Sequence, residues 1–225
     1  MSYTKSYRRT ISHDKVKMKP SGKVRIVDIT RKSEWEQRLY RCLASAPFRK
    51  YKNRREYLEK AVARGFHKLL LTFNGDTVGT IEYSPAEVSG FPIMGEDVVV
   101  MNCIWVLRRA KGHNFGKKLL NTMMKEEKNA SGFATVAVEN HWSPWMKKDQ
   151  MERLGFTAID SLKVKHKTEH KDQGVTVFLM WLPKARNARL PTWNTKKLLE
   201  GVTFCMGHPL YKPQSLKLKE IYEKC

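Results

Sequence analysis

The sequence predicts an α/β domain in which a mixed, mostly antiparallel central sheet carries helices on both faces. Two observations lead to this prediction. Apolar segments of strand-like composition alternate with amphipathic helical segments along residues 24–182, which is the pattern of an α/β protein. The early strands are joined by a short turn and must therefore run antiparallel, whereas the later strands are joined by helices.

The clearest local signal is the dipeptide Asn74-Gly75 between the apolar runs 68–73 and 77–83. Both residue types tolerate the positive φ that a two-residue hairpin turn requires, so we expect a hairpin here.

Gly65 and Gly155 each follow a helical segment and are expected to end it. The expected elements, in order, are a strand at 24–29, a helix after Thr30 or Ser33, a helix at 55–63, strands at 68–73, 77–83 and 97–107, a helix at 116–128, a strand at 134–138, a helix at 147–154 and a strand at 175–182.

Two basic segments flank this domain. Residues 1–23 contain few apolar side chains and are predicted to be a basic arm that is flexible on its own. Residues 183–225 are predicted to be a basic extension that packs on the domain through apolar side chains. These side chains are Trp193, Leu198, Leu199, Val202 and Phe204.

The overall charge points to an anionic partner. The chain has 43 Lys and Arg against 22 Asp and Glu, a formal net charge of +21. Such a surplus attracts polyanions by neutralising their phosphates and releasing counterions. We therefore predict contact with RNA or the ribosome, mostly through phosphates, because no RNA-recognition motif with aromatic pairs on adjacent strands is visible. The candidate contacts are Arg8, Arg9, Lys50, Arg54 and Arg55.

Composition disfavours several other classes of protein. No stretch is apolar enough to cross a bilayer, and the N-terminal residues lack the apolar core of a signal peptide. The four cysteines are scattered without framework spacing, which fits the reducing cytoplasm. Cys205 and His208 have no second ligand pair that would complete a zinc site, so we predict no metal.

The segment from Trp105 to Leu120 carries the chemical signal. It combines the end of an expected buried strand, a basic turn with glycines, and an amphipathic helix. Backbone N–H groups at the start of a helix favour anions, and the helix macrodipole adds to this preference. Gly112 and Gly116 allow a ligand to approach the backbone closely, and Asn114 tolerates left-handed geometry. A pyrophosphate is therefore the expected ligand, and the surrounding cations are Arg108, Arg109, Lys111, Lys117 and Lys118.

This segment resembles the pyrophosphate signature of the GNAT superfamily of N-acetyltransferases. That signature is Gln or Arg, two residues, Gly, one residue, Gly or Ala, and then Leu. Lys111 falls at its first position, Asn114 at the first Gly, Gly116 at the second and Leu119 at the Leu, while Val106 matches a Val that precedes it. The resemblance covers residues 24–182, including the hairpin, and the Cys-Ile-Trp-Val and Pro-Trp-Met segments are similar to a prokaryotic subgroup.

The resemblance implies that acetyl-CoA donates its acetyl group to an amine. It also implies a splayed end of the strand 97–107, which would place Trp105 to Leu107 beside the pantetheine and supply a backbone N–H to the oxyanion. The residues implied to bind acetyl-CoA are Trp105, Val106, Leu107, Lys111, Gly112, His113, Asn114, Phe115, Gly116 and Lys117.

The catalytic acid and base are less well marked. A base must remove a proton from the attacking amine, directly or through water. Glu139, at the end of the following strand, is our candidate for this base, and His141 is a further candidate. Many family members carry a Tyr four residues before the Gly-Phe pair, as general acid for the departing thiolate. Met151 stands there in this chain and cannot donate a proton.

Two functions are compatible with these observations. The first is an N-acetyltransferase, possible acceptors of which include a protein N-terminus, a lysine or a polyamine, associated with RNA or the ribosome. The second is a protein of the same fold that binds RNA or the ribosome with weak or lost catalysis, which the charge and Met151 favour. A kinase or NTPase is disfavoured, because the turn contains no Gly-Lys-Ser/Thr motif.

Overall fold

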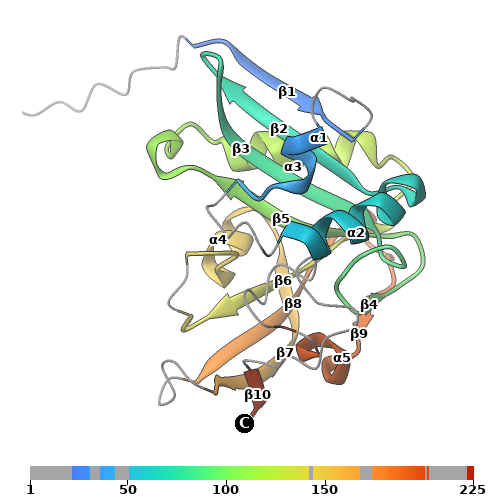
Figure 1. Cartoon of the computed structure of the whole chain (residues 1–225). Helices are drawn as coiled ribbons and strands as arrows, with labels where there is room; N and C mark the ends of the chain where they lie inside the picture. Colours follow the sequence, from blue (N-terminus) through green and yellow to red (C-terminus); the bar gives the residue numbers. More distant parts are fainter. Residues whose placement is uncertain are drawn as a thin grey trace, which may run out of the picture.

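The structure is a computed structural model that describes residues 22–30, 36–43, 51–141, 144–167, 174–200, 202 and 222–225. A large twisted sheet runs through the molecule, and helices lie against it (Figure 1). The elements are β1 (Val24–Asp28), α1 (Glu36–Tyr40), α2 (Tyr51–Ala61), η3 (Val62–Arg64), β2 (His67–Phe73), β3 (Asp76–Pro85), β4 (Ile93–Met94), β5 (Val98–Val106), η4 (Arg108–Ala110), α3 (Phe115–Glu126), β6 (Gly132–Glu139), α4 (Lys148–Arg153), β7 (Thr157–His166), β8 (Val175–Pro183), β9 (Thr192–Trp193), α5 (Thr195–Leu199) and β10 (Tyr222–Lys224).

The large sheet has the strand order β1-β2-β3-β5-β6-β8-β7-β10. Its neighbouring strands are antiparallel except for β5 and β6, which are parallel. A crossover through α3 connects these two strands, as parallel neighbours require. The structure thus confirms the mixed, mostly antiparallel sheet that the sequence predicts.

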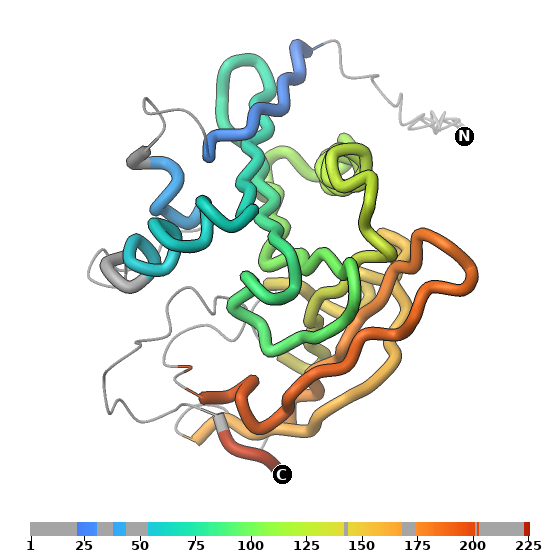
Figure 2. Tube along the Cα trace, turned by 90° about the vertical axis from the view of Figure 1, so that its right-hand side faces the viewer, coloured from blue at the N-terminus to red at the C-terminus, as the bar shows by residue number. Residues whose placement is uncertain are grey.

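Helices cover both faces of the sheet. In Figure 2, α1 and α2 lie on one side of the early strands and α3 lies on the other. The apolar face of α3 buries Phe115, Leu119, Leu120 and Met123. A Cβ atom on Gly79 of β3 would stand 3.2 Å from Leu119 Cδ1, so the absence of a side chain there lets α3 lie close to the sheet. Within the described ranges no helix is long and apolar enough to cross a membrane.

The hairpin between β2 and β3 forms at the predicted turn. Asn74 and Gly75 have φ values of 52° and 88°, so both turn residues occupy the left-handed region that this type of turn demands. The flanking residues Phe73 and Asp76 are paired. The local signal in the sequence therefore sets the register of the first two long strands.

The sequence analysis does not predict β7 or the short strands β4, β9 and β10. In β7, exposed Lys163 and Lys165 alternate with buried Val164 and His166. This is the period-two pattern of a strand with one solvated face. Its more buried side holds too few apolar residues for the strand to stand out in the sequence. Strand β10 pairs with β7 and so adds a final strand to that edge of the sheet.

Side chains that follow β8 join the main apolar cluster. Trp193, Leu198, Leu199 and Val202 are buried together with the sheet residues, and Trp193 Nε1 donates to Asp160 Oδ2 of β7 at 2.6 Å. The short strand β9 also pairs with β4. Phe204, the remaining apolar side chain of the predicted contact, lies outside the described residues.

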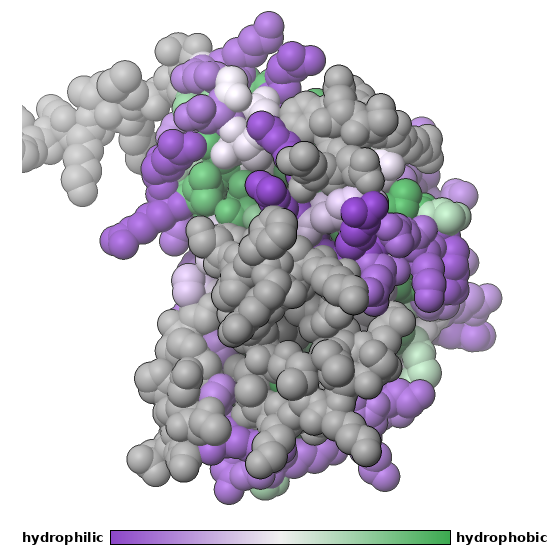
Figure 3. Space-filling model, viewed as in Figure 1, coloured by the Kyte–Doolittle hydropathy of each residue, from purple (hydrophilic) through white to green (hydrophobic). Residues whose placement is uncertain are grey.

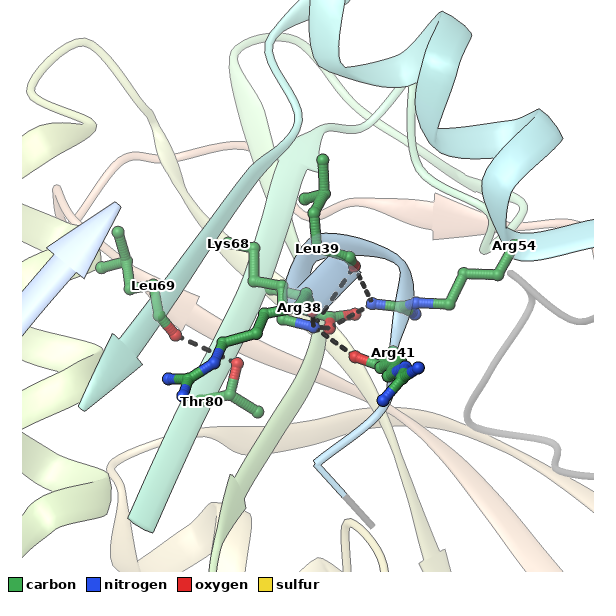
Figure 4. Close-up of polar contacts among 8 residues, drawn as sticks. Arg38, Leu39, Arg41, Arg54, Lys68, Leu69 and Thr80 are labelled. Carbon is green, nitrogen blue, oxygen red and sulfur yellow. Dashed lines mark hydrogen bonds and ion pairs between the residues drawn. The ribbon is translucent and has the colours of Figure 1, made fainter. Parts of the chain in front are cut away.

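Three buried charged side chains connect the helices α1 and α2 to the sheet. Glu82 Oε1 of β3 accepts from Arg54 Nη2 of α2 at 2.5 Å and lies 3.1 Å from Lys68 Nζ of β2. None of the three side chains is more than 1% exposed. The Lys68 ammonium also donates to the carbonyl oxygens of Arg38 and Arg41 at the end of α1 (Figure 4). We call Arg54, Glu82 and Lys68 the buried triad.

The environment of the buried triad opposes charge. Burial lowers the pKa of Lys68, and the neighbouring Glu82 carboxylate acts in the opposite direction by favouring the ammonium. The position of Arg54 corrects one prediction from the sequence. Its guanidinium is buried and bonded to Glu82 and to the carbonyl of Leu39, so it is not available to contact a nucleic acid.

Candidate functional site

The parallel strands β5 and β6 separate before they end. They are paired only where Val98–Val100 lie beside Gly132–Ala134. One residue further, Thr135 Oγ1 still donates to the carbonyl of Met101 at 2.7 Å. Beyond this point the two strands diverge, with α4 beside the opening (Figure 1). The splayed strand end that the resemblance implies is present.

The two facing edges of this opening differ. On the β6 side, Val138 N donates to the carbonyl of Met146 at 3.0 Å, so the segment before α4 partly covers β6. On the β5 side, Leu107 N donates to Val78 O of β3 at 2.8 Å. Because main-chain groups alternate along a strand, those of Ile104 and Val106 point away from β3 and toward the opening. Strand β5 therefore presents an open edge.

The turn after β5 and the start of α3 continue this open edge. Gly112 and Asn114 have φ values of 88° and 56°, which turn the chain sharply into the helix. The Asn114 side chain makes no capping hydrogen bond. The N–H groups of Phe115, Gly116 and Lys117 belong to the first helical turn and have no acceptor within the helix. They form a cluster of donors at the positive end of the helix dipole.

A cleft of about 720 Å³ occupies the opening between β5, α3 and α4. Eight of the ten residues predicted to bind acetyl-CoA line it, namely Trp105, Val106, Lys111, Gly112, Asn114, Phe115, Gly116 and Lys117. Leu107 is not among the lining residues, and its N–H is used by β3. His113 instead stacks on Phe115, with ring centroids 5.0 Å apart. The opposite wall is formed by Pro144, Met146, Gln150, Met151, Arg153 and Leu154. Of these residues, the sequence analysis places only Met151 near the thioester, through the resemblance.

Gly116 leaves the cleft open at the helix N-terminus. A Cβ atom at this position would meet only Leu154 Cδ2, at 4.0 Å, across the cleft. The protein itself therefore has room for a side chain at residue 116, and the space that the glycine leaves lies within the cleft. A ligand can use this space to reach the N–H donors of α3.

The cleft is cationic. Arg108, Lys111, Lys117 and Arg153 line it, and no Asp or Glu stands among the described residues of its wall. Arg153 Nη2 also pairs with Asp149 Oδ2 at 2.8 Å on the exposed side of α4. Cationic side chains and helix N–H donors around one opening form a site suited to a ligand with phosphate groups.

The predicted catalytic residues lie outside the wall of the cleft. Glu139 ends β6 with 47% of its side chain exposed, and its Oε1 lies 3.9 Å from Lys148 Nζ. His141 is half-buried and does not line the cleft either. Met151, by contrast, lines the cleft and is 2% exposed. Trp105 Nε1 is a buried donor of the same cleft wall with no hydrogen-bond partner among the described residues.

The residues predicted to contact nucleic acid are not brought together in the described part of the chain. Arg8, Arg9 and Lys50 lie outside the described residues, as do Cys205 and His208, and Arg54 is buried. Arg55 is 59% exposed and pairs with Glu59 at 2.9 Å. On the face drawn in Figure 3, hydrophilic residues cover most of the described surface, and the apolar patches are small.

Comparisons with known proteins agree with this geometry. Residues 30–156, more than half of the chain, match the family model described as Acetyltransferase (GNAT) family. A comparison with curated proteins found no match. Among solved structures, a protein described as a GNAT-family acetyltransferase from Desulfovibrio desulfuricans is 15% identical, with a TM-score of 0.51, over 72% of this chain and 100% of that one. This likeness concerns the fold.

Two further solved structures are similar at lower scores. The ribosomal-protein-S18-alanine N-acetyltransferase of Escherichia coli is 13% identical, with a TM-score of 0.49, over 75% of this chain and 100% of that one. A GNAT acetyltransferase of Elizabethkingia anophelis with acetyl-CoA bound is 14% identical, with a TM-score of 0.46, over 71% and 97%. The family match, the fold and the splayed strands lead to one conclusion: the chain belongs to the acetyltransferase (GNAT) family and is an acyltransferase.

Proposed function

We propose that this protein is an N-acetyltransferase that binds acetyl-CoA in the cleft between β5, α3 and α4. One observation carries the proposal: the open edge of β5 leads directly to the unbonded N–H groups at the start of α3. Acetyl-CoA is a thioester whose arm contains amides and ends at a pyrophosphate. Its amides need a strand edge to bond, and its pyrophosphate needs an anion site at the end of that edge. The Acetyltransferase (GNAT) family match supports the same substrate.

The residues of the cleft fit the two ends of acetyl-CoA. The N–H groups of Phe115, Gly116 and Lys117 would hold the pyrophosphate, assisted by the Lys111 ammonium, all at the wall of the cleft. The main-chain groups of Ile104 and Val106 face the opening and would bond the amides of the pantetheine arm. No acidic side chain in the described wall opposes the phosphates.

The chemistry follows from what these groups can do. When the amine attacks the thioester carbonyl, an N–H group of β5 would donate to the developing oxyanion. Met151 supplies no proton, so the departing thiolate must take its proton from another donor or from water. Glu139 lies at the end of β6 but outside the cleft wall, and we propose that it accepts the proton of the amine through a water molecule.

Calorimetric titration of the purified, nucleic-acid-free protein tests this function. We expect acetyl-CoA and coenzyme A to bind in the micromolar range with a stoichiometry of one. Binding of coenzyme A should weaken as salt increases, because the phosphates meet cationic groups. A protein that is folded by circular dichroism but binds neither compound would contradict the proposed function.

We propose further that the acceptor amine is presented by an RNA-containing particle such as the ribosome. The net charge of +21 supports this, because it favours polyanions and disfavours small cationic acceptors.

Fluorescence anisotropy measures the affinity of the protein for a single-stranded RNA of about 20 nucleotides. We expect the logarithm of the affinity to fall linearly with that of the salt concentration, with a slope of about −3 or steeper. A chain without residues 1–20 should show a shallower slope, and an affinity that does not change with salt would contradict the proposal.

A further inference from the structure

The cleft between β5, α3 and α4 has two ends, and α4 lies along the distance between them. Just after α4, Leu154 stands beside the start of α3, because a Cβ atom on Gly116 would lie 4.0 Å from Leu154 Cδ2. Just before α4, Lys147 forms a bridge with Val138 of β6. The residues that precede α4 therefore lie at the other end, where β5 and β6 begin to diverge. We call this the strand end of the cleft.

Met146 lies opposite Ile104 at the strand end. The bond from Thr135 Oγ1 to the carbonyl of Met101 marks the level at which the two strands begin to diverge. Ile104 and Val138 each follow this level by three residues (101 to 104 and 135 to 138), so they stand opposite each other in the parallel register. Val138 N donates to Met146 O at 3.0 Å. Because Ile104 and Met146 both line the cleft, they form its two sides at this level.

Met146 has a backbone conformation that its residue type disfavours. Its φ is 41°, in the left-handed region where the Cβ atom of an L-residue crowds the following carbonyl oxygen. The other non-glycine residues with positive φ in the described part of the chain are all Asn or Asp, whose short polar side chains tolerate this region. Strained backbone persists where the surrounding structure fixes it, and it gathers at functional sites. A methionine where glycine would cost less points to a role for its side chain.

The Met146 side chain closes the strand end. It lines the cleft but is only 1% exposed, so it forms a packed wall. Ile104 and Met151 also line the cleft, at 8% and 2% exposed, and all three side chains belong to the main apolar cluster. The cationic lining residues come instead from the turn after β5, from α3 and from the end of α4. Among the described lining residues, the strand end thus presents no charged side chain.

An acyl-CoA in the proposed site would carry its acyl group to the strand end. Its pyrophosphate would lie at the N–H groups of α3, and its arm would follow the open edge of β5 from Val106 toward Ile104. The thioester is at the opposite end of this arm from the pyrophosphate, and so would reach the level of Ile104 and Met146. This step rests on the proposed function, whereas the conformation and the burial of Met146 do not.

We propose that Met146 determines the specificity for the acyl group by closing the strand end, so that the donor carries a short, uncharged acyl group. A longer chain would have to displace a buried side chain from the packed interior. An acidic acyl group such as succinyl would also lose its hydration among apolar side chains without a counter-ion. Met151, whose N–H donates to the carbonyl of Lys147 at 3.1 Å, forms the adjoining wall.

Calorimetric titration with coenzyme A, acetyl-CoA and butyryl-CoA tests this assignment by binding alone. We expect the parent protein to bind butyryl-CoA about tenfold or more weakly than acetyl-CoA. In Met146→Ala and Met146→Gly this ratio should fall to about twofold or less, because the removed side chain leaves room for the longer chain. Met123→Ala is a matched control, since Met123 is buried on the apolar face of α3 and is not among the lining residues of the cleft. It should keep the preference of the parent protein. Succinyl-CoA should bind more weakly than acetyl-CoA in all of these proteins, because the enlarged space stays apolar.

Thermal unfolding tests the strain at Met146 separately. At an ordinary buried position, a glycine variant is less stable than an alanine variant, because glycine loses more conformational freedom on folding. At a φ of 41° this order should reverse, so Met146→Gly should unfold at a higher temperature than Met146→Ala. At Met123, inside the helix α3, the glycine variant should be the less stable of the two.

Three outcomes overturn the inference while the proposed function stands. The first is equal affinity of the parent protein for acetyl-CoA and butyryl-CoA, and the second is a parent-like preference in a folded Met146→Gly protein. The third is a parent protein that binds succinyl-CoA as tightly as acetyl-CoA. A lower unfolding temperature for Met146→Gly than for Met146→Ala overturns the strain at this position. If coenzyme A itself does not bind to the folded parent protein, the proposed function fails, and the inference that rests on it fails too.

Discussion

Gly116→Val is expected to weaken acetyl-CoA binding by about 100-fold or more, equal to a loss of about 2.7 kcal/mol. The cause is steric. The first side-chain atom at residue 116 points across the cleft, where the nearest protein atom is Leu154 Cδ2 at 4.0 Å. A branched side chain would therefore fill the space through which a pyrophosphate reaches the N–H groups of α3. Calorimetric titration with acetyl-CoA measures the effect.

The variant is informative because the fold should tolerate it. Gly116 lies in α3 and does not have a positive φ, and no protein atom within 4 Å opposes a Cβ except at the limit of contact. Gly116→Ala should give a smaller loss of affinity than Gly116→Val, and both should unfold within a few degrees of the parent protein. The matching change at Gly174, where nothing lies within 4 Å of a Cβ, should leave binding unchanged. Parent-like affinity in Gly116→Val would remove the start of α3 from the proposed site.

Those parts of the fold that depend on local signals could be predicted from the sequence. The hairpin at Asn74-Gly75 and the helix α3 follow from turn chemistry and from a helical apolar period. Strand β7 could not be recognised in the same way, since the polar His166 shares its more buried side with only Leu162 and Val164 along residues 162–166. The pairing of β10 with β7 was also out of reach, because contacts between distant segments leave no periodic signal.

The candidate site shows the same division. The wall formed by β5 and α3 is continuous in sequence, so one motif from Trp105 to Lys117 predicts most of it. The wall from α4 comes from a segment beyond β6, and only the divergence of the strands brings Gln150 and Leu154 to the cleft. Arg54 is the opposite case. Its charge predicts a surface residue, but Glu82, distant in sequence, pairs with it in the interior.

Glu82→Gln is expected to lower the free energy of unfolding by about 3–5 kcal/mol, because it leaves two cations of the buried triad without their counter-ion. For a chain of this size, such a loss corresponds to a Tm lower by about 6–20 °C. Arg54 and Lys68 are at most 1% exposed, so water cannot replace the carboxylate. Glu59→Gln is a matched control, since Glu59 pairs with Arg55 at a similar distance on the surface, and it should change stability by less than about 1 kcal/mol.

The pH dependence of Glu82→Gln separates lost charge from lost packing. Burial lowers the pKa of Lys68 in the parent protein, and Glu82 opposes this shift, so removal of the carboxylate should lower the pKa further. Below its folded pKa, Lys68 remains a buried cation at full cost. As pH rises above that value, the folded state has released a proton that the unfolded chain still binds, and stability rises with pH. Chemical denaturation measures the free energy of unfolding of Glu82→Gln and of the parent protein between neutral and alkaline pH. We expect the difference between the two to become smaller as pH rises, whereas a difference independent of pH would assign the loss to packing.

The double variant Glu82→Gln with Lys68→Met should be less destabilised than the two single losses added together, because it removes one of the unpaired cations.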